Sequence, residues 1–258
     1  MPVANDLYYW AYHQDLKDKP AVVLIHGAGG NHLFFPPKIR RLEGVRVFAL
    51  DLPGHGKSGG VGRQMIAAYA QAVVGWMDAV KMSKAVFAGH SMGGAIAMTL
   101  AKDYKDRVLG LCLIDTGAKL RVSKAILENS EHDATFPLAV SLLLSQAFGA
   151  HTPKRMADLA ARRLLEVRPT VLHADMVACN AFDIRDALPA LQVPALVICG
   201  EEDKLTPLRY SQYLADKLPQ AELAVIPRAG HMAMLENSDE VGRVMTAYCR
   251  ALDYAAGA

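Results

Sequence analysis

Short apolar runs alternate with helical patterns along most of this chain of 258 residues. The runs are rich in valine, isoleucine, leucine and alanine, and they cover residues 21–26, 45–51, 85–89, 108–115, 195–200 and 222–226. Continuous apolar runs are expected of parallel strands that are covered on both faces. The helical patterns cover residues 66–80, 93–102, 208–217 and 239–252. This alternation predicts an α/β fold, with right-handed crossovers and helices on both faces of a mostly parallel sheet.

The alternation breaks once, between residues 116 and 191. This segment has helical patterns but no apolar run that reads as a strand, and prolines recur along it. Connections of this length without regular structure are uncommon in compact domains. We therefore predict a helical cap at residues 116–191, inserted into a core formed by residues 1–115 and 192–258.

Charge and cysteine usage exclude several classes of partner and cofactor. The formal net charge is +2 and the two signs are interspersed, so nothing indicates nucleic acid or a membrane surface as partner. The four cysteines, Cys112, Cys179, Cys199 and Cys249, lack the paired spacing of a metal or redox site. We expect no metal and no cofactor. Free thiols without a secretory signal suggest a cytoplasmic protein.

One stretch without charged residues, at 134–153, needs a check against a membrane-spanning helix. Such a helix needs roughly 20 predominantly apolar residues, and here serine, glutamine, glycine and histidine interrupt the stretch. An apolar helix that covers a pocket is the better interpretation. The apolar residues that would form such a roof are Phe136, Leu138, Val140, Leu142, Leu143, Phe148 and Met156, although packing on the core is the simpler role for each. The cap segment holds no cluster of arginines, so an anionic substrate is not specifically indicated.

The motif GHSMGG at residues 89–94 joins a predicted strand to a predicted helix. In that context G-x-S-x-G is typical of a sharp turn that carries a nucleophilic serine. The turn has no room for bulky neighbours, a need that Gly89 and Gly93 meet. It also exposes the hydroxyl of Ser91 beside a helix N-terminus, whose amides favour anions. The pattern predicts Ser91 as the nucleophile.

A serine hydroxyl needs a base, and that base needs a carboxylate to orient it. His231 lies in a glycine-flanked loop after the last predicted strand, where ligands gather in open α/β sheets. Asp203 follows the preceding strand and is our preferred acid. Glu201 and Glu202 beside it leave a solvated acidic turn as the alternative reading of that segment. Asp115, at the end of another predicted strand, is the rival acid.

Acyl transfer places negative charge on the former carbonyl oxygen, so fixed N–H donors must meet it. The small-residue loop HGAGG at residues 26–30 follows the first strong strand. We predict the amides of Ala28 and Met92 as the two donors, with Gly29 as the alternative to Ala28. The loop lacks the spacing of the known nucleotide-binding motifs.

Together these motifs closely resemble the α/β-hydrolase superfamily, in its single-domain branch with a helical cap. The matching segments are HG at 26–27, DLPGHGKS at 51–58, GHSMGG at 89–94, VP at 193–194 leading to Gly200 and Asp203, and GH at 230–231. Their order, with serine before aspartate before histidine, is that of the superfamily. The resemblance implies an eight-stranded, mainly parallel sheet with the cap after the sixth strand. Only residues 7–13 precede the first strong run as a candidate strand, so we predict seven to eight strands.

The resemblance implies a serine hydrolase, in the first place a carboxylesterase that cleaves a small to medium acyl ester through a covalent acyl-enzyme. Thioester, lactone and carbon–carbon bond hydrolysis pass through the same machinery and stay open, because one fold hosts many chemistries. A small-molecule receptor that retains the triad is an alternative from another class. Ser91 disfavours the branches with an aspartate nucleophile. The expected partner is a small acyl substrate, and the expected state is a monomer or homodimer.

Overall fold

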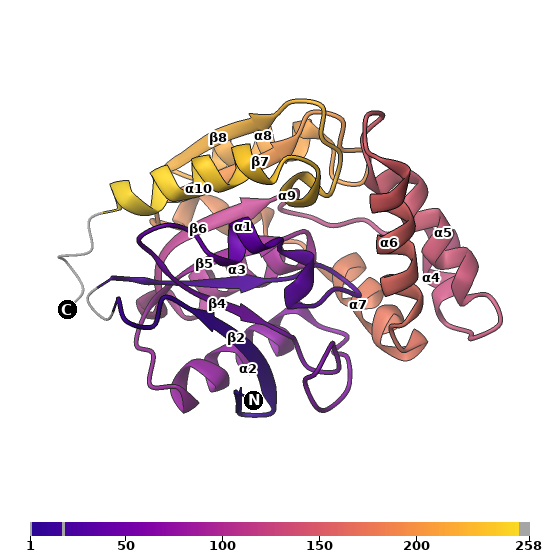
Figure 1. The fold of residues 1–258 in the computed structure, drawn as a ribbon, viewed down its shortest axis with the longest axis horizontal. Helices are drawn as coiled ribbons and strands as arrows, with labels where there is room; N and C mark the ends of the chain where they lie inside the picture. The colour runs from indigo at the N-terminus through magenta and orange to yellow at the C-terminus, as the bar shows by residue number, and fades with distance from the viewer. Residues whose placement is uncertain (1, 17–18, 253–258) are drawn as a thin grey trace.

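An eight-stranded sheet forms the centre of the protein, in a computed structural model that describes residues 2–16 and 19–252 (Figure 1). The strands are β1 (Val3–Ala4), β2 (Leu7–Tyr12), β3 (Ala21–Ile25), β4 (Arg46–Leu50), β5 (Ala85–His90), β6 (Val108–Ile114), β7 (Ala195–Gly200) and β8 (Ala221–Ile226). Their spatial order is β1-β2-β4-β3-β5-β6-β7-β8. The pairs β1–β2 and β2–β4 are antiparallel, and all other neighbouring pairs are parallel. The predicted mostly parallel α/β sheet is confirmed.

The first edge strand, β1, is present but only two residues long. Val3 pairs with Tyr8 and Ala4 with Leu7. Asn5 and Asp6 make the connecting turn with φ angles of 47° and 62°, as expected of a two-residue hairpin, whose tight turn asks for positive φ. The sheet therefore has the larger of the two predicted strand numbers. A strand of two residues is too short to leave a periodic pattern in the sequence.

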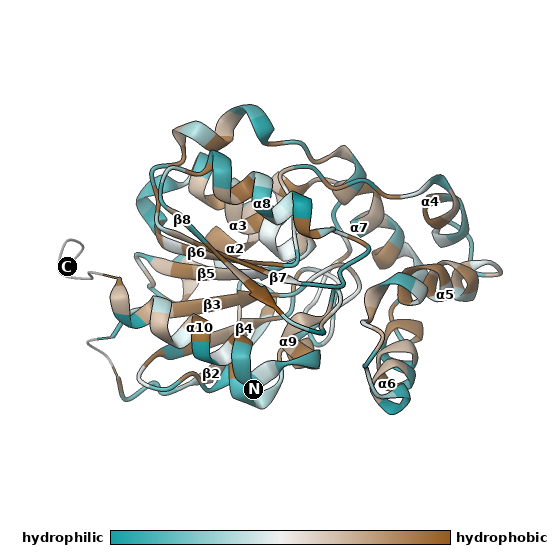
Figure 2. Ribbon diagram, turned by 90° about the horizontal axis from the view of Figure 1, so that it is seen from above, coloured by the Kyte–Doolittle hydropathy of each residue, from teal (hydrophilic) through white to brown (hydrophobic). Residues whose placement is uncertain are grey.

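Helices cover both faces of the sheet (Figure 2). One face carries α2 (Ile66–Ala79), α3 (Met92–Asp103) and α8 (Leu208–Lys217), and the other carries α1 (Pro37–Arg40), α9 (Ala233–Glu236) and α10 (Ser238–Ala251). Because side chains alternate along a strand, Val23 and Ile25 of β3 pack under the first set of helices. Val22 and Leu24 pack under the second. This two-sided burial explains why the inner parallel strands appear as continuous apolar runs.

Four α-helices stand between β6 and β7 and group together at one side of the sheet (Figure 1). They are α4 (Lys124–Ser130), α5 (Phe136–Ala147), α6 (Lys154–Leu165) and α7 (Pro169–Ala181), followed by the 3₁₀-helix η3 (Arg185–Ala190). Two further 3₁₀-helices are η1 (His32–Phe34) and η2 (Lys105–Arg107). The four helices have a small apolar cluster of their own, which includes Phe136, Val140 and Leu172. We call them the cap; its exact limits at residues 116 and 191 stay a prediction.

The uncharged stretch at 134–153 contains α5, which has only 12 residues. Across residues 2–16 and 19–252, none of the helices combines the length and the apolar character that crossing a membrane requires.

Candidate active site

Ser91 stands at the turn between β5 and α3, in a strained backbone conformation. Its φ and ψ angles are 52° and −114°, a combination that non-glycine residues rarely adopt. Two hydrogen bonds hold the turn: the Ser91 amide donates to the carbonyl of Ile114 at 2.9 Å, and the Thr116 hydroxyl donates to the carbonyl of Ser91 at 2.8 Å. The neighbouring strand β6 and the residues just after it thus keep the serine in this conformation.

The two glycines that flank the serine are required by close backbone packing. A Cβ atom at Gly89 would lie 2.1 Å from the carbonyl oxygen of Gly93, and one at Gly93 would lie 2.0 Å from that of Ile25. Both distances are far inside van der Waals contact, and the atoms that would have to move are backbone. Neither position could therefore carry a side chain without a shift of the backbone, as the motif predicted.

His231 and Asp203 are brought together by the loops that follow β8 and β7. Nδ1 of His231 lies 2.9 Å from Oδ2 of Asp203. Because a carboxylate only accepts, this bond places a proton on Nδ1 and leaves Nε2 of a neutral His231 as a proton acceptor. Burial alone would raise the pKa of Asp203, but His231 and the groups of Thr206 lower it to about 2. The carboxylate is therefore ionised at neutral pH.

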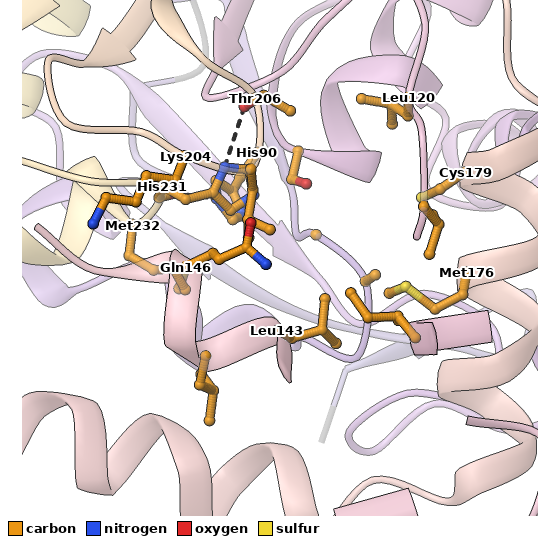
Figure 3. Close-up of a pocket in the computed structure, with 18 of the residues that line it drawn as sticks. His90, Leu120, Leu143, Gln146, Met176, Cys179, Lys204, Thr206, His231 and Met232 are labelled. Carbon is orange, nitrogen blue, oxygen red and sulfur yellow. Dashed lines mark hydrogen bonds between the residues drawn. The ribbon is translucent and has the colours of Figure 1, made fainter. Parts of the chain in front are cut away.

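Thr206, which was not predicted from the sequence, contacts both Asp203 and His231. Its hydroxyl donates to Oδ2 of Asp203 at 2.7 Å and lies 3.2 Å from Nδ1 of His231 (Figure 3). Oδ1 of Asp203 accepts the amides of Leu205 and Thr206. The carboxylate thus has acceptor bonds on both oxygens, which fix its orientation toward the histidine.

Two further side chains position the loop that carries His231. Buried His90 lies with Nε2 2.8 Å from the carbonyl oxygen of His231, and burial above all lowers the pKa of His90 to about 3, so it stays neutral. One carboxylate oxygen of Glu236, on α9, accepts the amides of Gly230 and Met232 at 2.9 and 3.2 Å. Its other oxygen accepts the amide of Gly149 in the cap at 2.8 Å.

Asp115, the rival acid, is hydrogen-bonded to backbone amides instead of to His231. It is fully buried, and its two oxygens accept the amides of Gly200 and Ala233 at 2.8 and 3.0 Å. No hydrogen bond joins it to His231 in the described part of the chain. Burial, reinforced by the charge of Asp203, raises its pKa well above the usual range. Asp115 therefore ties the end of β7 to the start of α9.

Asp115, Asp203 and Cys199 place one potential ligand atom each within 4.8 Å of one another. The donors do not fit a metal ion, because the oxygens of both carboxylates are already engaged by amides, a hydroxyl and an imidazole. Burial also raises the pKa of the Cys199 thiol to about 12, and the thiolate is the form that binds metals.

The two predicted oxyanion donors differ in position but share one property. Met92 is the first residue of α3 and Ala28 lies in the loop after β3. Neither backbone amide has an acceptor within residues 2–16 and 19–252. The amide of Gly29, the alternative, instead donates to Oδ2 of Asp175 at 2.8 Å. The hydrogen bonding therefore favours Ala28 over Gly29.

Asp175 reaches this loop from the cap helix α7 and is completely buried. Besides the amide of Gly29, its carboxylate accepts the hydroxyl of Tyr69 at 2.5 Å and lies 2.8 Å from Nε2 of His55. Nδ1 of His55 lies 3.0 Å from the carbonyl of Pro53. Both ring nitrogens thus face groups that only accept, which requires His55 to be the imidazolium. Burial lowers the pKa of His55, but the Asp175 charge and hydrogen bond raise it net above its ordinary value.

A cavity of about 210 Å³ lies between the cap and the ends of the strands, and both Ser91 and His231 line it. Figure 3 shows its polar side chains, including His231, His90 and Thr206, at one end. Leu120, Met176 and Cys179 lie at the other end. The arrangement offers a nucleophile and a base at the edge of an apolar chamber.

The predicted roof is only partly correct. Leu143 and Phe148 line the cavity, but Phe136 and Val140 are buried within the cap's own cluster. Leu138 is 51% exposed. Leu142 packs against the cap cluster, and Met156 is half-buried away from the cavity. Other residues of the four cap helices that line the cavity, and that were not predicted to do so, are Ile126, Leu144, Gln146, Ala147, Ala160, Leu164, Met176 and Cys179.

Residues 22–244 match the model of a family described as the alpha/beta hydrolase family. The dihydrolipoyllysine-residue acetyltransferase component of an acetoin cleaving system from Pseudomonas putida is 32% identical over 243 residues. That alignment covers 89% of this chain but only 63% of the relative, so the chain spans less than two thirds of that protein.

Two other similar proteins are covered over nearly their full length. A pimeloyl-[acyl-carrier protein] methyl ester esterase from Neisseria meningitidis serogroup B is 31% identical, over 84% of this chain and 88% of the relative. The crystal structure of the enol-lactonase from Burkholderia xenovorans LB400 aligns with a TM-score of 0.88 at 24% identity. That alignment covers 95% of this chain and 96% of that one.

The contacts of Asp203 and Asp115 predict different effects for their asparagine variants. Asp203→Asn removes the negative charge that orients His231, and kcat on a p-nitrophenyl ester should fall about 10³- to 10⁴-fold. Asp115→Asn places an amide NH₂ against a backbone N–H, and we expect a lower melting temperature with a far smaller loss of kcat. Both variants are measured by steady-state kinetics and thermal unfolding. If Asp115→Asn abolishes catalysis in a folded protein while Asp203→Asn does not, the assignment of the acid is wrong.

Asp175→Asn tests whether the cap holds the oxyanion loop. Breaking a buried ion pair costs about 3–5 kcal/mol of stability. Because the loop is only displaced, kcat should fall less than the roughly 10²- to 10³-fold cost of losing one oxyanion donor, with KM nearly unchanged.

The raised pKa of His55 means that the ion pair between His55 and Asp175 stabilises the fold fully below about pH 6.5. Its contribution fades as pH rises through the folded-state pKa.

The matched control for Asp175→Asn is Asp158→Asn, which removes an exposed carboxylate from the cap helix α6. Unfolding free energy against pH and the separate values of kcat and KM are the readouts. An Asp175→Asn protein that is folded, keeps the wild-type kcat and shows an unchanged difference in stability at all pH values would contradict the role of this contact.

Proposed function

The chain belongs to the alpha/beta hydrolase family, and we propose that it is a serine hydrolase that cleaves carboxylic esters of small to medium acyl chains. One observation carries the proposal: Ser91 and His231 line a single, mainly apolar cavity, and Nδ1 of His231 is hydrogen-bonded to the carboxylate of Asp203. The three side chains come from three separate loops at the carboxyl ends of β5, β7 and β8, where parallel α/β sheets gather their ligands.

In the acylation step, Nε2 of His231 takes the proton of the Ser91 hydroxyl while Oγ attacks the carbonyl carbon of the ester. The carbonyl oxygen becomes negatively charged, and the amides of Ala28 and Met92 are the donors that meet it. The tetrahedral intermediate then collapses. The bond to the alcohol oxygen breaks, and the imidazolium returns the proton to that oxygen, which leaves as the alcohol.

In the deacylation step, water takes the place of the alcohol. His231 removes a proton from the water, the hydroxide attacks the acyl carbon, and Oγ of Ser91 departs with the proton that the histidine gives back. Asp203 stays ionised throughout and stabilises the imidazolium in both steps. Its low pKa, about 2, suits that constant negative charge.

The cavity supports the choice of acyl group. Its volume of about 210 Å³ lies below the usual range of ligand pockets, about 300–1,000 Å³, so a small to medium chain is the better fit. Its walls are mainly apolar, with Leu120, Leu143 and Met176 among them. Thioesters, lactones and substrates with a cleavable carbon–carbon bond share the acyl-enzyme route and are the alternatives within the same mechanism.

A fluorophosphonate probe should label Ser91, because only an activated serine attacks it at neutral pH. The label is located by mass spectrometry of the peptide that contains the serine. Ser91→Ala should lose both the label and the hydrolysis of a p-nitrophenyl butyrate substrate, with the melting temperature nearly unchanged. Labelling that persists in the variant would reject Ser91 as the nucleophile.

The same substrate separates an enzyme from a receptor that retains the triad. An enzyme should release p-nitrophenol for many turnovers per protein molecule, whereas a receptor would stop after a few and stay occupied. The count of product per protein, followed to substrate exhaustion, decides between them.

A further inference from the structure

Cationic side chains stand where the catalytic cavity reaches the surface. The charged residues that line the cavity are Arg121 and Lys204, both exposed, and no aspartate or glutamate of the described residues joins them. No carboxylate pairs with either side chain within the described ranges. Among the residues that line the cavity, the fully charged side chains are therefore cationic only.

A second cavity of about 340 Å³ adjoins the first, and Arg121 lines both cavities. We call it the arginine groove, and its polar and aromatic lining residues are Lys119, Arg121, Arg185, Arg209, Tyr210 and Tyr213. They come from three segments that are far apart in the sequence: the chain after β6, the start of η3 and the helix α8. This explains why no cluster of arginines was visible in the sequence.

The groove has more positive charge than its own carboxylate balances. Asp183 pairs with Lys119 at 2.9 Å and with Arg185 at 2.7 Å, so one negative charge serves two cations. Arg209 lies over the ring of Tyr210 at 5.2 Å, a contact that leaves its charge uncompensated. Neither Arg209 nor Arg121 has an acidic partner among the residues the structure describes. Four cations thus share Asp183 as their one ion-pair partner among the described residues, with the charge of Asp186 acting only on Arg185 from farther away.

A concave surface lined by one sign of charge concentrates its field and attracts an opposite ion. Arginine guanidinium groups match carboxylate and phosphate oxygens in pairs of parallel hydrogen bonds. Tyr210 and Tyr213 add aromatic walls, and Tyr210 can approach the chain closely because Gly117 has no side chain: a Cβ there would lie 2.9 Å from its ring. The groove is therefore suited to an anionic group attached to an apolar or aromatic moiety.

We propose that the arginine groove binds a carboxylate or phosphate on the leaving group of the substrate, while the acyl group occupies the apolar cavity at Ser91. This proposal rests on the proposed esterase function and specifies its substrate class. The open groove suits the leaving group because that part departs first. The acyl group must stay on Ser91, under the cap, until water releases it.

The test compares three butyrate esters of phenols: phenyl butyrate, its 4-carboxy derivative and its 4-phosphate derivative. The double variant Arg121→Gln/Arg209→Gln should lower kcat/KM for the two anionic esters about tenfold more than for the neutral ester, mainly through KM. Tenfold is the effect of about 1.4 kcal/mol, the lower end for a hydrogen bond to a charged group. The ratio of the two anionic esters separates a carboxylate from a phosphate preference.

The matched control is Arg41→Gln/Arg250→Gln. It removes the same number of charges from residues that line neither cavity, and Arg41, like Arg209, lies over a tyrosine ring, at 5.1 Å from that of Tyr12. Its kinetics should follow the wild type with every ester. An equal loss with neutral and anionic esters, or an equal effect of the control, would overturn the proposal. So would a preference for esters whose anion is on the acyl chain.

A binding measurement tests the groove proposal independently of the proposed esterase function. Benzoate, phenyl phosphate and neutral benzyl alcohol are titrated by calorimetry into the Ser91→Ala protein. The two anions should bind more tightly than the alcohol and lose about tenfold in affinity when Arg121→Gln/Arg209→Gln is added. If the anions bind in this way while the wild type hydrolyses no ester, the anion site in the groove is supported and the proposed esterase function is rejected. If the anions show no preference over the alcohol, the groove proposal fails.

Discussion

The backbone packing at the turn of Ser91 is the constraint on which the site depends. β5, the turn and α3 approach each other and β3 so closely that a single Cβ at Gly89 or Gly93 would clash with main-chain oxygens. This contact holds the serine at a positive φ angle and exposes its side chain at the end of the sheet. It also makes Met92 the first residue of α3, so its amide is free of the helix ladder. The proposed nucleophile and one proposed oxyanion donor thus depend on the same close packing.

The cap is joined to the catalytic loops by buried or half-buried carboxylates. Asp175 of α7 holds the amide of Gly29 beside the predicted oxyanion donor Ala28. On the other side, Glu236 of α9 binds the amide of Gly149 in the cap and the two amides that flank His231. A displacement of the cap would therefore move the oxyanion loop and the histidine loop together. The cap does more than cover the cavity, because the loop of Ala28 is hydrogen-bonded to Asp175 of the cap, and the loop of His231 to Glu236, which also binds the cap.

Sequence patterns predicted those features of the protein that depend on residues close together in the chain. Continuous apolar runs predicted β3 to β8 to within about a residue. Two-sided burial accounts for the runs of the inner strands, whereas β8, at the edge of the sheet, is only partly buried. The steric need for glycine beside Ser91 is equally local. Asp175 and the cations of the arginine groove were not predicted, since the residues that they meet lie far along the chain. Thr206 was missed although Asp203, which accepts its hydroxyl, is only three residues away. The prediction of the roof residues was only partly correct for a related reason. An apolar residue in a helix indicates burial, but it does not indicate whether the side chain faces the cavity or the cap's own cluster.

The central claim is that Ser91 carries the acyl group during turnover. The most direct measurement mixes the wild-type protein with p-nitrophenyl butyrate, quenches in acid within milliseconds to seconds, and determines the mass of each proteolytic peptide. The fast departure of p-nitrophenol makes deacylation the slower step. The account therefore predicts a butyryl group on the peptide that contains Ser91, formed faster than turnover and lost at a rate that matches turnover. Turnover without any acylated peptide, or with the butyryl group on a different residue, would contradict it.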